Sequence, residues 1–240
     1  MGDGIKPTIY SHFTLGDMAA YYMLEEERQV ELLLVPVQKE KELNEKFDAL
    51  FDSKRLHGDS LIQVKLLNDM YPGAYGPGTS MRNSETIDMC RFEKQIHKTE
   101  GAKEVIETYL EDGRGHNFIH TLTWTKGDYA LGSTTTIINN ADTPTTLELL
   151  TSFSLGLISP FEEADASECL KLHRIRSKWS QEGRLVTESA EDLQLEPSWA
   201  YWQVNSTRYG QIGSMPVKGY FPFGAVEDTK AGVVWAAQLA

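Results

Sequence analysis

The chain has 240 residues, of which 35 are acidic and 23 basic, so its formal net charge is −12 at pH 7. Such a charge repels phosphate backbones and anionic lipid surfaces, and it argues against nucleic-acid and membrane partners. The length suffices for a sizeable core without disulfides or structural metals, and we expect a single domain spanning residues 1–240.

Hydropathy and cysteine usage further narrow the class of protein to which the chain can belong. The longest apolar run is far shorter than the roughly 20 residues that a membrane span requires, and the N-terminus lacks a signal-peptide core. We therefore expect a cytoplasmic protein. Cys90 and Cys169 are far apart and belong to no CxxC motif or Cys/His cluster. This spacing predicts buried thiols and indicates neither a disulfide framework nor a metal site.

Periodicity in the first third of the chain predicts a hairpin, one helix and a long loop. The hairpin comprises residues 18–24 and 30–35, joined by an acidic turn. One short helix is expected near residues 39–52, because Leu43, Phe47, Leu50 and Phe51 recur at helical spacing. A strand at 61–67 then enters a loop rich in glycine and proline, residues 68–85, which is long enough to be functional or mobile.

Alternating apolar residues predict a series of short strands after this loop. In the first of them Cys90, Phe92 and Ile96 are expected on one face. Short strands with regular turn signals are typical of a sandwich or barrel, so the predicted fold class is all-β. The predicted strands are 88–98, 103–110, 117–125, 129–138, 146–155, a strand beginning at Leu170, and 231–240.

The histidines give no decisive chemical motif. His116 and His120 would share one face of a strand, but we interpret His120 as a core residue and His116 as a turn residue. A mutarotase-type mechanism needs a histidine acid and a carboxylate base. His173 could be that acid, yet spacing alone selects no glutamate as its partner.

Several motifs, taken in their order and spacing, carry a resemblance to a known family. The downstream motifs are His173 to Trp179 (HRIRSKW), Glu182 to Arg184 (EGR), Arg208 to Gly210 (RYG) and Phe221 to Val226 (FPFGAV); the upstream ones are Tyr71-Pro72, Tyr75 to Gly78 (YGPG) and Ser80 to Arg82 (SMR). Together they resemble the N-terminal domain of glycoside hydrolase family 36, whose best-known members are α-galactosidases.

The resemblance implies a β-supersandwich of the galactose mutarotase type, serving as an accessory domain of a retaining enzyme that removes terminal α-galactosyl groups. Retention uses two carboxyl groups about 5 to 5.5 Å apart. In the family both belong to a (β/α)8 barrel that follows further sandwich strands, so no catalytic residue, metal or cofactor is expected in this chain. We expect the sandwich to be incomplete at its C-terminus. The implied partners are a galactose-containing oligosaccharide, the barrel, and further copies of the chain.

The resemblance also implies a set of substrate-binding residues. In the family, an aspartate and an arginine on the upstream loop approach the sugar, in tetrameric members at a neighbouring subunit's active site. Arg82 matches that arginine, Ser80 stands at the aspartate position, and Tyr75 lies in the same loop.

Trp199 completes the set, within an aromatic group that suits sugar stacking but would equally serve as core or subunit interface. The group comprises Trp179, Trp199, Tyr201, Trp202, Tyr209 and Tyr220. The alternative function is a free-standing carbohydrate-binding or oligomerisation module without enzymatic activity.

Overall fold

A computed structural model describes residues 7–25, 29–52, 59–70, 84–162, 168–195 and 219–239. The chain divides into two compact units, Met1–Pro72 with Met81–Leu157 and Gly73–Ser80 with Ile158–Ala240. The expected single domain stays a prediction. None of the described helices is long and apolar enough to cross a bilayer.

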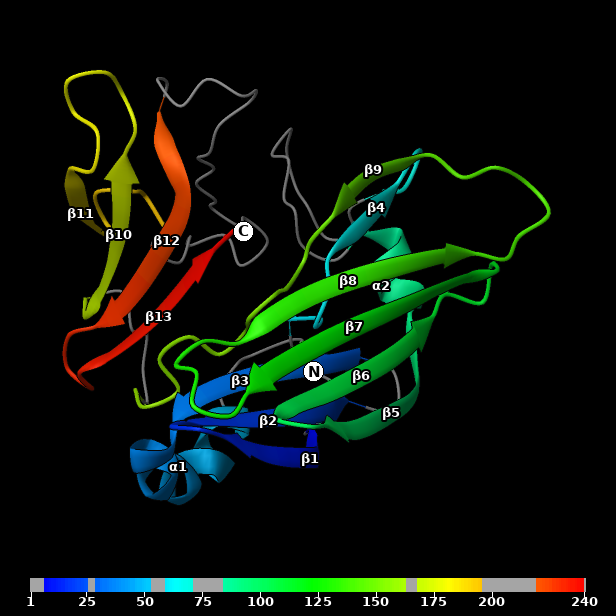
Figure 1. The fold of residues 1–240 in the computed structure, drawn as a ribbon, viewed down its shortest axis with the longest axis horizontal. Helices are drawn as coiled ribbons and strands as arrows, with labels where there is room; N and C mark the ends of the chain where they lie inside the picture. The colour runs from blue at the N-terminus through cyan, green and yellow to red at the C-terminus, as the bar shows by residue number, and fades with distance from the viewer. Residues whose placement is uncertain are drawn as a thin grey trace. The chain divides into compact units, whose positions relative to one another are not determined.

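The described residues are nearly all extended, as predicted (Figure 1). The strands are β1 (Thr8–Leu15), β2 (Met18–Glu25), β3 (Gln29–Pro36), β4 (Val64–Leu66), β5 (Arg91–Glu100), β6 (Lys103–Glu111), β7 (His116–Thr125), β8 (Gly132–Asn139), β9 (Leu147–Leu150), β10 (Leu170–Arg176), β11 (Leu185–Ser189), β12 (Tyr220–Asp228) and β13 (Val233–Gln238). The helices are α1 (Glu40–Asp52), α2 (Glu85–Met89) and the short 3₁₀ helix η1 (Val37–Lys39).

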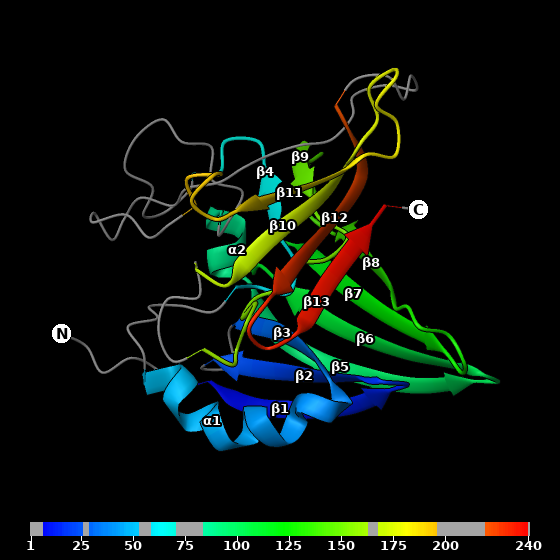
Figure 2. The same cartoon turned by 90° about the vertical axis from the view of Figure 1, so that its left-hand side faces the viewer.

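The first unit contains a sandwich of two antiparallel sheets, ordered β1-β2-β3 and β5-β6-β7-β8 (Figures 1 and 2), and a two-stranded antiparallel sheet of β4 and β9. Alternation along the strands places one face of each sheet in a shared core, where Tyr22 and Leu32 meet Ile106 and Phe118. Each of these four side chains is fully buried. The sandwich predicted from the short alternating strands is thus confirmed.

The predicted helix is confirmed as α1, which covers the outer face of β1 and β2 (Figure 2). Its apolar Leu43 is fully buried. At its N-terminus Glu40 accepts a 2.6 Å hydrogen bond from the Tyr21 hydroxyl and lies 2.8 Å from Nε2 of His12. Burial, together with this carboxylate, raises the pKa of Tyr21. The first turns of the helix are therefore held by these polar contacts and by the burial of Leu43.

The expectation that Cys90, Phe92 and Ile96 share one face is wrong. The register of β5 against β6 shifts between Phe92 and Lys94, so Phe92 pairs with the buried Leu110 while Ile96 pairs with Glu107 on the other face. A bulge adds one residue to one strand, and a shift of one residue reverses which side chains face inward. Cys90 itself is the C-cap of α2 and is buried, as is Cys169, so both cysteines are buried thiols as predicted.

Several predicted boundaries also differ from the structure. The predicted strand at 61–67 is regular only over β4, and Tyr129 lies outside β8 with 89% of its surface exposed. β1 and α2 were not predicted: β1 has a mostly polar sequence, and α2 is too short to show a helical period. The signal that indicates α2 is Ser84, whose hydroxyl caps the helix by accepting from the Ile87 amide.

The second unit contains one antiparallel sheet, ordered β11-β10-β12-β13. The HRIRSKW motif begins in β10 and the FPFGAV motif lies in β12, with His173 opposite Ala225 and Arg174 opposite Gly224. Arg174 is buried, forms an ion pair with Glu188 of β11, and lies 4.3 Å from the centre of the Tyr220 ring. Two motifs far apart in sequence therefore form one strand pair whose contacts are structural.

Candidate functional site at the stem of the 71–83 loop

Tyr75, Ser80 and Arg82 belong to residues 71–83, which lie outside the described residues, as does Trp199. The structure therefore does not place the predicted sugar contacts. It does describe both ends of the segment. The amide of Glu85 donates a 2.8 Å hydrogen bond to the carbonyl of Met70, so the described residues on either side of the segment lie next to each other.

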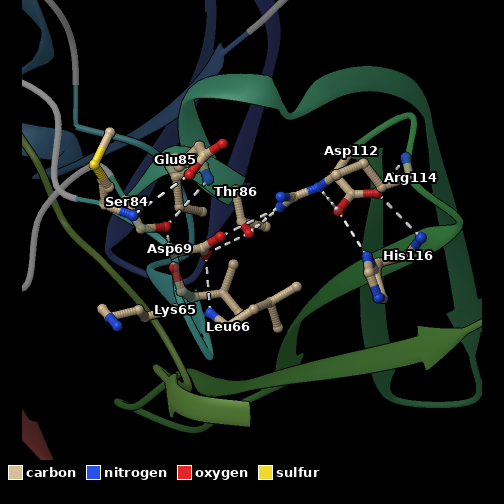
Figure 3. Close-up of polar contacts among 12 residues, drawn as sticks. Lys65, Leu66, Asp69, Ser84, Glu85, Thr86, Asp112, Arg114 and His116 are labelled. Atoms are coloured by element: carbon tan, nitrogen blue, oxygen red, sulfur yellow. Dashed lines mark hydrogen bonds and ion pairs between the residues drawn. The ribbon is translucent and has the colours of Figure 1, made fainter. Parts of the chain in front are cut away.

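The stem of this loop is built from β4, the turn after it and the start of α2 (Figure 3). Asp69 accepts hydrogen bonds at Oδ2 from the Leu66 amide (2.9 Å) and from the Thr86 hydroxyl. The Ser84 hydroxyl donates to the carbonyl of Val64 in β4 while it caps α2. These bonds tie the outgoing and returning ends of the loop to one short strand.

Arg114 joins this stem to the β6–β7 turn (Figure 3). Its Nη2 donates to the Thr86 hydroxyl and lies 3.6 Å from Oδ1 of Asp69, while its Nε donates to Oδ2 of Asp112 at 3.2 Å. The two carboxylate side chains are 3% and 0% exposed. A single guanidinium therefore lies between two buried carboxylates that come from different parts of the chain.

The β6–β7 turn is shaped around the Asp112 carboxylate. It accepts backbone N–H groups from Arg114 (2.8 Å) and His116 (3.1 Å), and His116 Nδ1 at 2.7 Å. Burial by itself would raise the pKa of Asp112, but the hydrogen bond from His116 and those from the two amides hold it below its ordinary value. Gly113 and Gly115 have φ of 69° and 96°, a conformation that allows the turn to close around this carboxylate.

His116 was expected in a turn, but it is the first residue of β7 and only 6% exposed. Its Nε2 lies 2.8 Å from the Thr145 hydroxyl, so the order is carboxylate, imidazole, hydroxyl. The same order activates nucleophiles in hydrolases, where the hydroxyl must also be open to substrate. Here both ring nitrogens are engaged within the fold, and the arrangement supports the loop stem.

His120, expected as a satisfied core histidine, is fully buried in β7 but only half satisfied. Its Nε2 lies 2.8 Å from Ser133 Oγ, and that hydroxyl donates onward to the carbonyl of Ser152. Nε2 must therefore be the protonated nitrogen. Within the described part of the chain Nδ1 has no partner, and burial lowers the pKa of His120 to about 4.

The histidine of the HRIRSKW motif lies beside a carboxylate in the structure. His173 Nε2 lies 2.9 Å from Glu227 of β12, and its Nδ1 lies 2.8 Å from the Thr187 hydroxyl of β11. Sequence spacing could not select Glu227 because strand pairing, and not proximity in the chain, brings it there. The two side chains bond directly to each other. An acid and a base that act on a sugar would instead lie on opposite sides of it, so this pair does not have the mutarotase-type arrangement.

One group in the second unit has metal-ligand chemistry. The ligand atoms of Glu162, Cys169 and Asp228 lie within 4.8 Å of one another. Lys230 Nζ already lies 2.5 Å from Glu162, and Asp228 accepts amides from Lys230 and Ala231. Burial and the Asp228 charge raise the pKa of the Cys169 thiol, which disfavours the thiolate that binds metals. We interpret this group as the support of the β12–β13 turn.

These features define an all-β sandwich with a buried polar network at the two ends of the 71–83 segment. No protein-family model and no curated protein matches the sequence. Solved structures do match, among them those of two glycoside hydrolase family 36 α-galactosidases from Geobacillus stearothermophilus. AgaB has a TM-score of 0.55 at 12% identity over 93% of this chain, and AgaA has 0.57 at 11% over 92%.

The match covers 32% of each of those two chains, so this chain spans about a third of their length. At such low identity the likeness establishes the fold, and it confirms the fold that the motif resemblance implied.

The β6–β7 turn provides a first test of the stem. Gly115→Ala should lower the free energy of unfolding by about 2 kcal/mol or more, because a Cβ at φ 96° would lie 3.0 Å from the Ala141 backbone nitrogen. The matched control is Gly101→Ala, whose φ is 65° but whose Cβ would meet nothing within 4 Å, and whose cost should stay near about 1 kcal/mol. Urea unfolding measures both, and equal losses would show that the close approach is unimportant.

Proposed function

We propose that this chain is the N-terminal accessory domain of an α-galactosidase-like retaining glycoside hydrolase that removes terminal α-galactosyl groups from oligosaccharides. The observation that carries the proposal is the fold shared with two α-galactosidases over more than nine-tenths of this chain and about a third of theirs. The motif resemblance supports the same family independently of the coordinates. The catalytic carboxylates would belong to a partner barrel.

In this proposal the 71–83 loop contributes to the rim of the active site, with Tyr75, Ser80 and Arg82 toward the sugar and Trp199 as a further contact. The stem supports this role, because a loop that positions a substrate needs fixed ends. Buried ion pairs cost desolvation energy and are weak evidence for stability alone. The network of Asp69, Arg114 and Asp112 is therefore better explained by the need to hold the loop.

Oligomerisation is the second proposed contribution of this domain. β13 lies at the edge of its sheet among the described strands, and Val234 is 56% exposed there. An edge strand with unpaired backbone groups can pair with another chain. The alternative, a free-standing carbohydrate-binding or oligomerisation module, remains open and differs in one respect: it needs no barrel.

The reading frame that contains this chain decides between these two functions. We expect its whole product to hydrolyse an aryl α-galactoside, and we expect residues 1–240 alone to be inactive, since no pair of catalytic carboxylates is proposed in them. Turnover by repurified residues 1–240 would overturn the division of roles. A product that contains no barrel and binds galactosides without turnover would establish the alternative.

In the active product, Arg82→Ala should lower kcat/KM by about 10- to 100-fold. A guanidinium that donates charge-assisted hydrogen bonds to sugar hydroxyls contributes about 1.5 to 3 kcal/mol. Lys126→Ala, at the exposed turn that follows β7, is the control and should leave kcat/KM unchanged. Melting temperatures of both variants separate a lost contact from a lost fold, and unchanged kinetics in Arg82→Ala would remove it from the site.

A further inference from the structure

The turn between β10 and β11 carries an indole on a rigid frame. The Gln181 amide donates to the Lys178 carbonyl at 2.8 Å, and the Gly183 amide donates to the Arg176 carbonyl at 2.9 Å. Arg176 also donates from Nη1 to the Gln181 side chain at 3.0 Å. These three bonds close the turn around Trp179, so the backbone that carries the indole is fixed.

Trp179 nevertheless points its side chain to solvent. It is 75% exposed, although burying a ring of this size would be favourable. Ser180, which follows it, has a φ of 63°, a conformation that costs energy for a residue with a Cβ. Neither feature stabilises the fold. Backbone strain beside an exposed aromatic ring indicates that the turn serves a contact outside the molecule.

The surroundings of the indole indicate which chemistry that contact takes. Lys178, Glu182 and Arg184 are all exposed in the turn that carries the indole, and their side chains supply hydrogen-bond donors and acceptors. A stable protein interface needs about 1,000 Å² of buried surface, far more than one ring provides. The net charge of −12 disfavours nucleic-acid bases as the stacking partner.

We propose that Trp179 is the stacking platform of a carbohydrate-binding subsite that takes a pyranose ring, with the polar side chains of the turn hydrogen-bonded to its hydroxyls. A pyranose has one apolar face and a rim of hydroxyls, which matches a flat indole with a polar surround. This subsite uses no residue of the 71–83 segment. It needs no barrel, so it goes beyond the proposed function and stands or fails without it.

The test uses the 240-residue chain and methyl α-galactopyranoside as the probe. The Trp179 indole N–H resonance, assigned by its absence from Trp179→Phe, should shift saturably with sugar over a millimolar range. Trp179→Ala, followed by the resonances of its neighbours, should raise the Kd at least about tenfold. The internal reference is Trp124, whose indole donates to the Asp128 carbonyl at 2.9 Å and should not respond.

Leu185→Ala distinguishes a sugar from a protein partner. Leu185 is 59% exposed next to the turn, so a protein docking on apolar surface would bury it as well, whereas ring stacking on Trp179 would not. We expect Leu185→Ala to leave the Kd for the glycoside unchanged. A Trp179 resonance that ignores the sugar would overturn the proposal. A Trp179 resonance that shifts only with protein concentration, and no longer shifts in Leu185→Ala, would also overturn the proposal.

Discussion

Replacing Arg114 with methionine should lower the free energy of unfolding by about 3 kcal/mol, because it leaves the buried carboxylates of Asp69 and Asp112 without their shared cation. Methionine keeps much of the side-chain volume. The fall in the free energy of unfolding therefore measures the loss of charge and hydrogen bonds more than the loss of packing. Lys41→Met is the matched control. Its ion pair with Glu45 is fully on the surface, 4.0 Å long and 90% and 68% exposed, and should be worth no more than about 0.5 kcal/mol.

The same variant tests whether the network holds the loop stem. Amide exchange at Glu85, whose N–H bonds to the Met70 carbonyl, should accelerate more in Arg114→Met than the global loss of stability requires. Adding Asp112→Asn should recover part of the loss, because the variant then carries one fewer unpaired buried charge. Additive losses in the double variant would show that Arg114 and Asp112 do not act together.

The second large effect is a pH dependence caused by His120. Its pKa in the fold is lowered from 6.5 to about 4 by burial, so the unfolded chain binds a proton more readily between these values. Stability from the neutral imidazole is therefore fully present above pH 6.5 and is lost as pH falls toward 4. A shift of this size corresponds to about 3 kcal/mol at pH 4.

His120→Gln isolates this contribution, because glutamine can donate to the Ser133 hydroxyl but does not titrate. We expect wild type to lose about 3 kcal/mol more than the variant between pH 7 and pH 4. Carboxylates such as Asp112 titrate in both proteins and cancel in the difference. Chemical unfolding of both proteins at several pH values between 7 and 4 measures this difference in stability. Parallel curves for the two proteins would mean that His120 is protonated in the fold or hydrated within it.

The sequence by itself determined the fold class, the position of α1 and most of the strands. These features follow from local periodicity: Leu43 and its partners repeat at helical spacing, and Phe118, His120 and Leu122 alternate along β7. The motif resemblance added the family of folds, which the match to the two α-galactosidases confirms. It also directed attention to the loop that carries Arg82.

The tertiary structure alone decided the register of β5 and the partners of the charged residues. The bulge after Phe92 reverses a strand face and has no periodic signal of its own. Arg114 meets Asp69 across 45 positions of sequence, and His173 meets Glu227 across 54. Such pairs depend on which strands become neighbours, and that choice minimises the energy of the whole sheet. Local pattern identifies what each segment is, whereas long-range packing determines which charges meet.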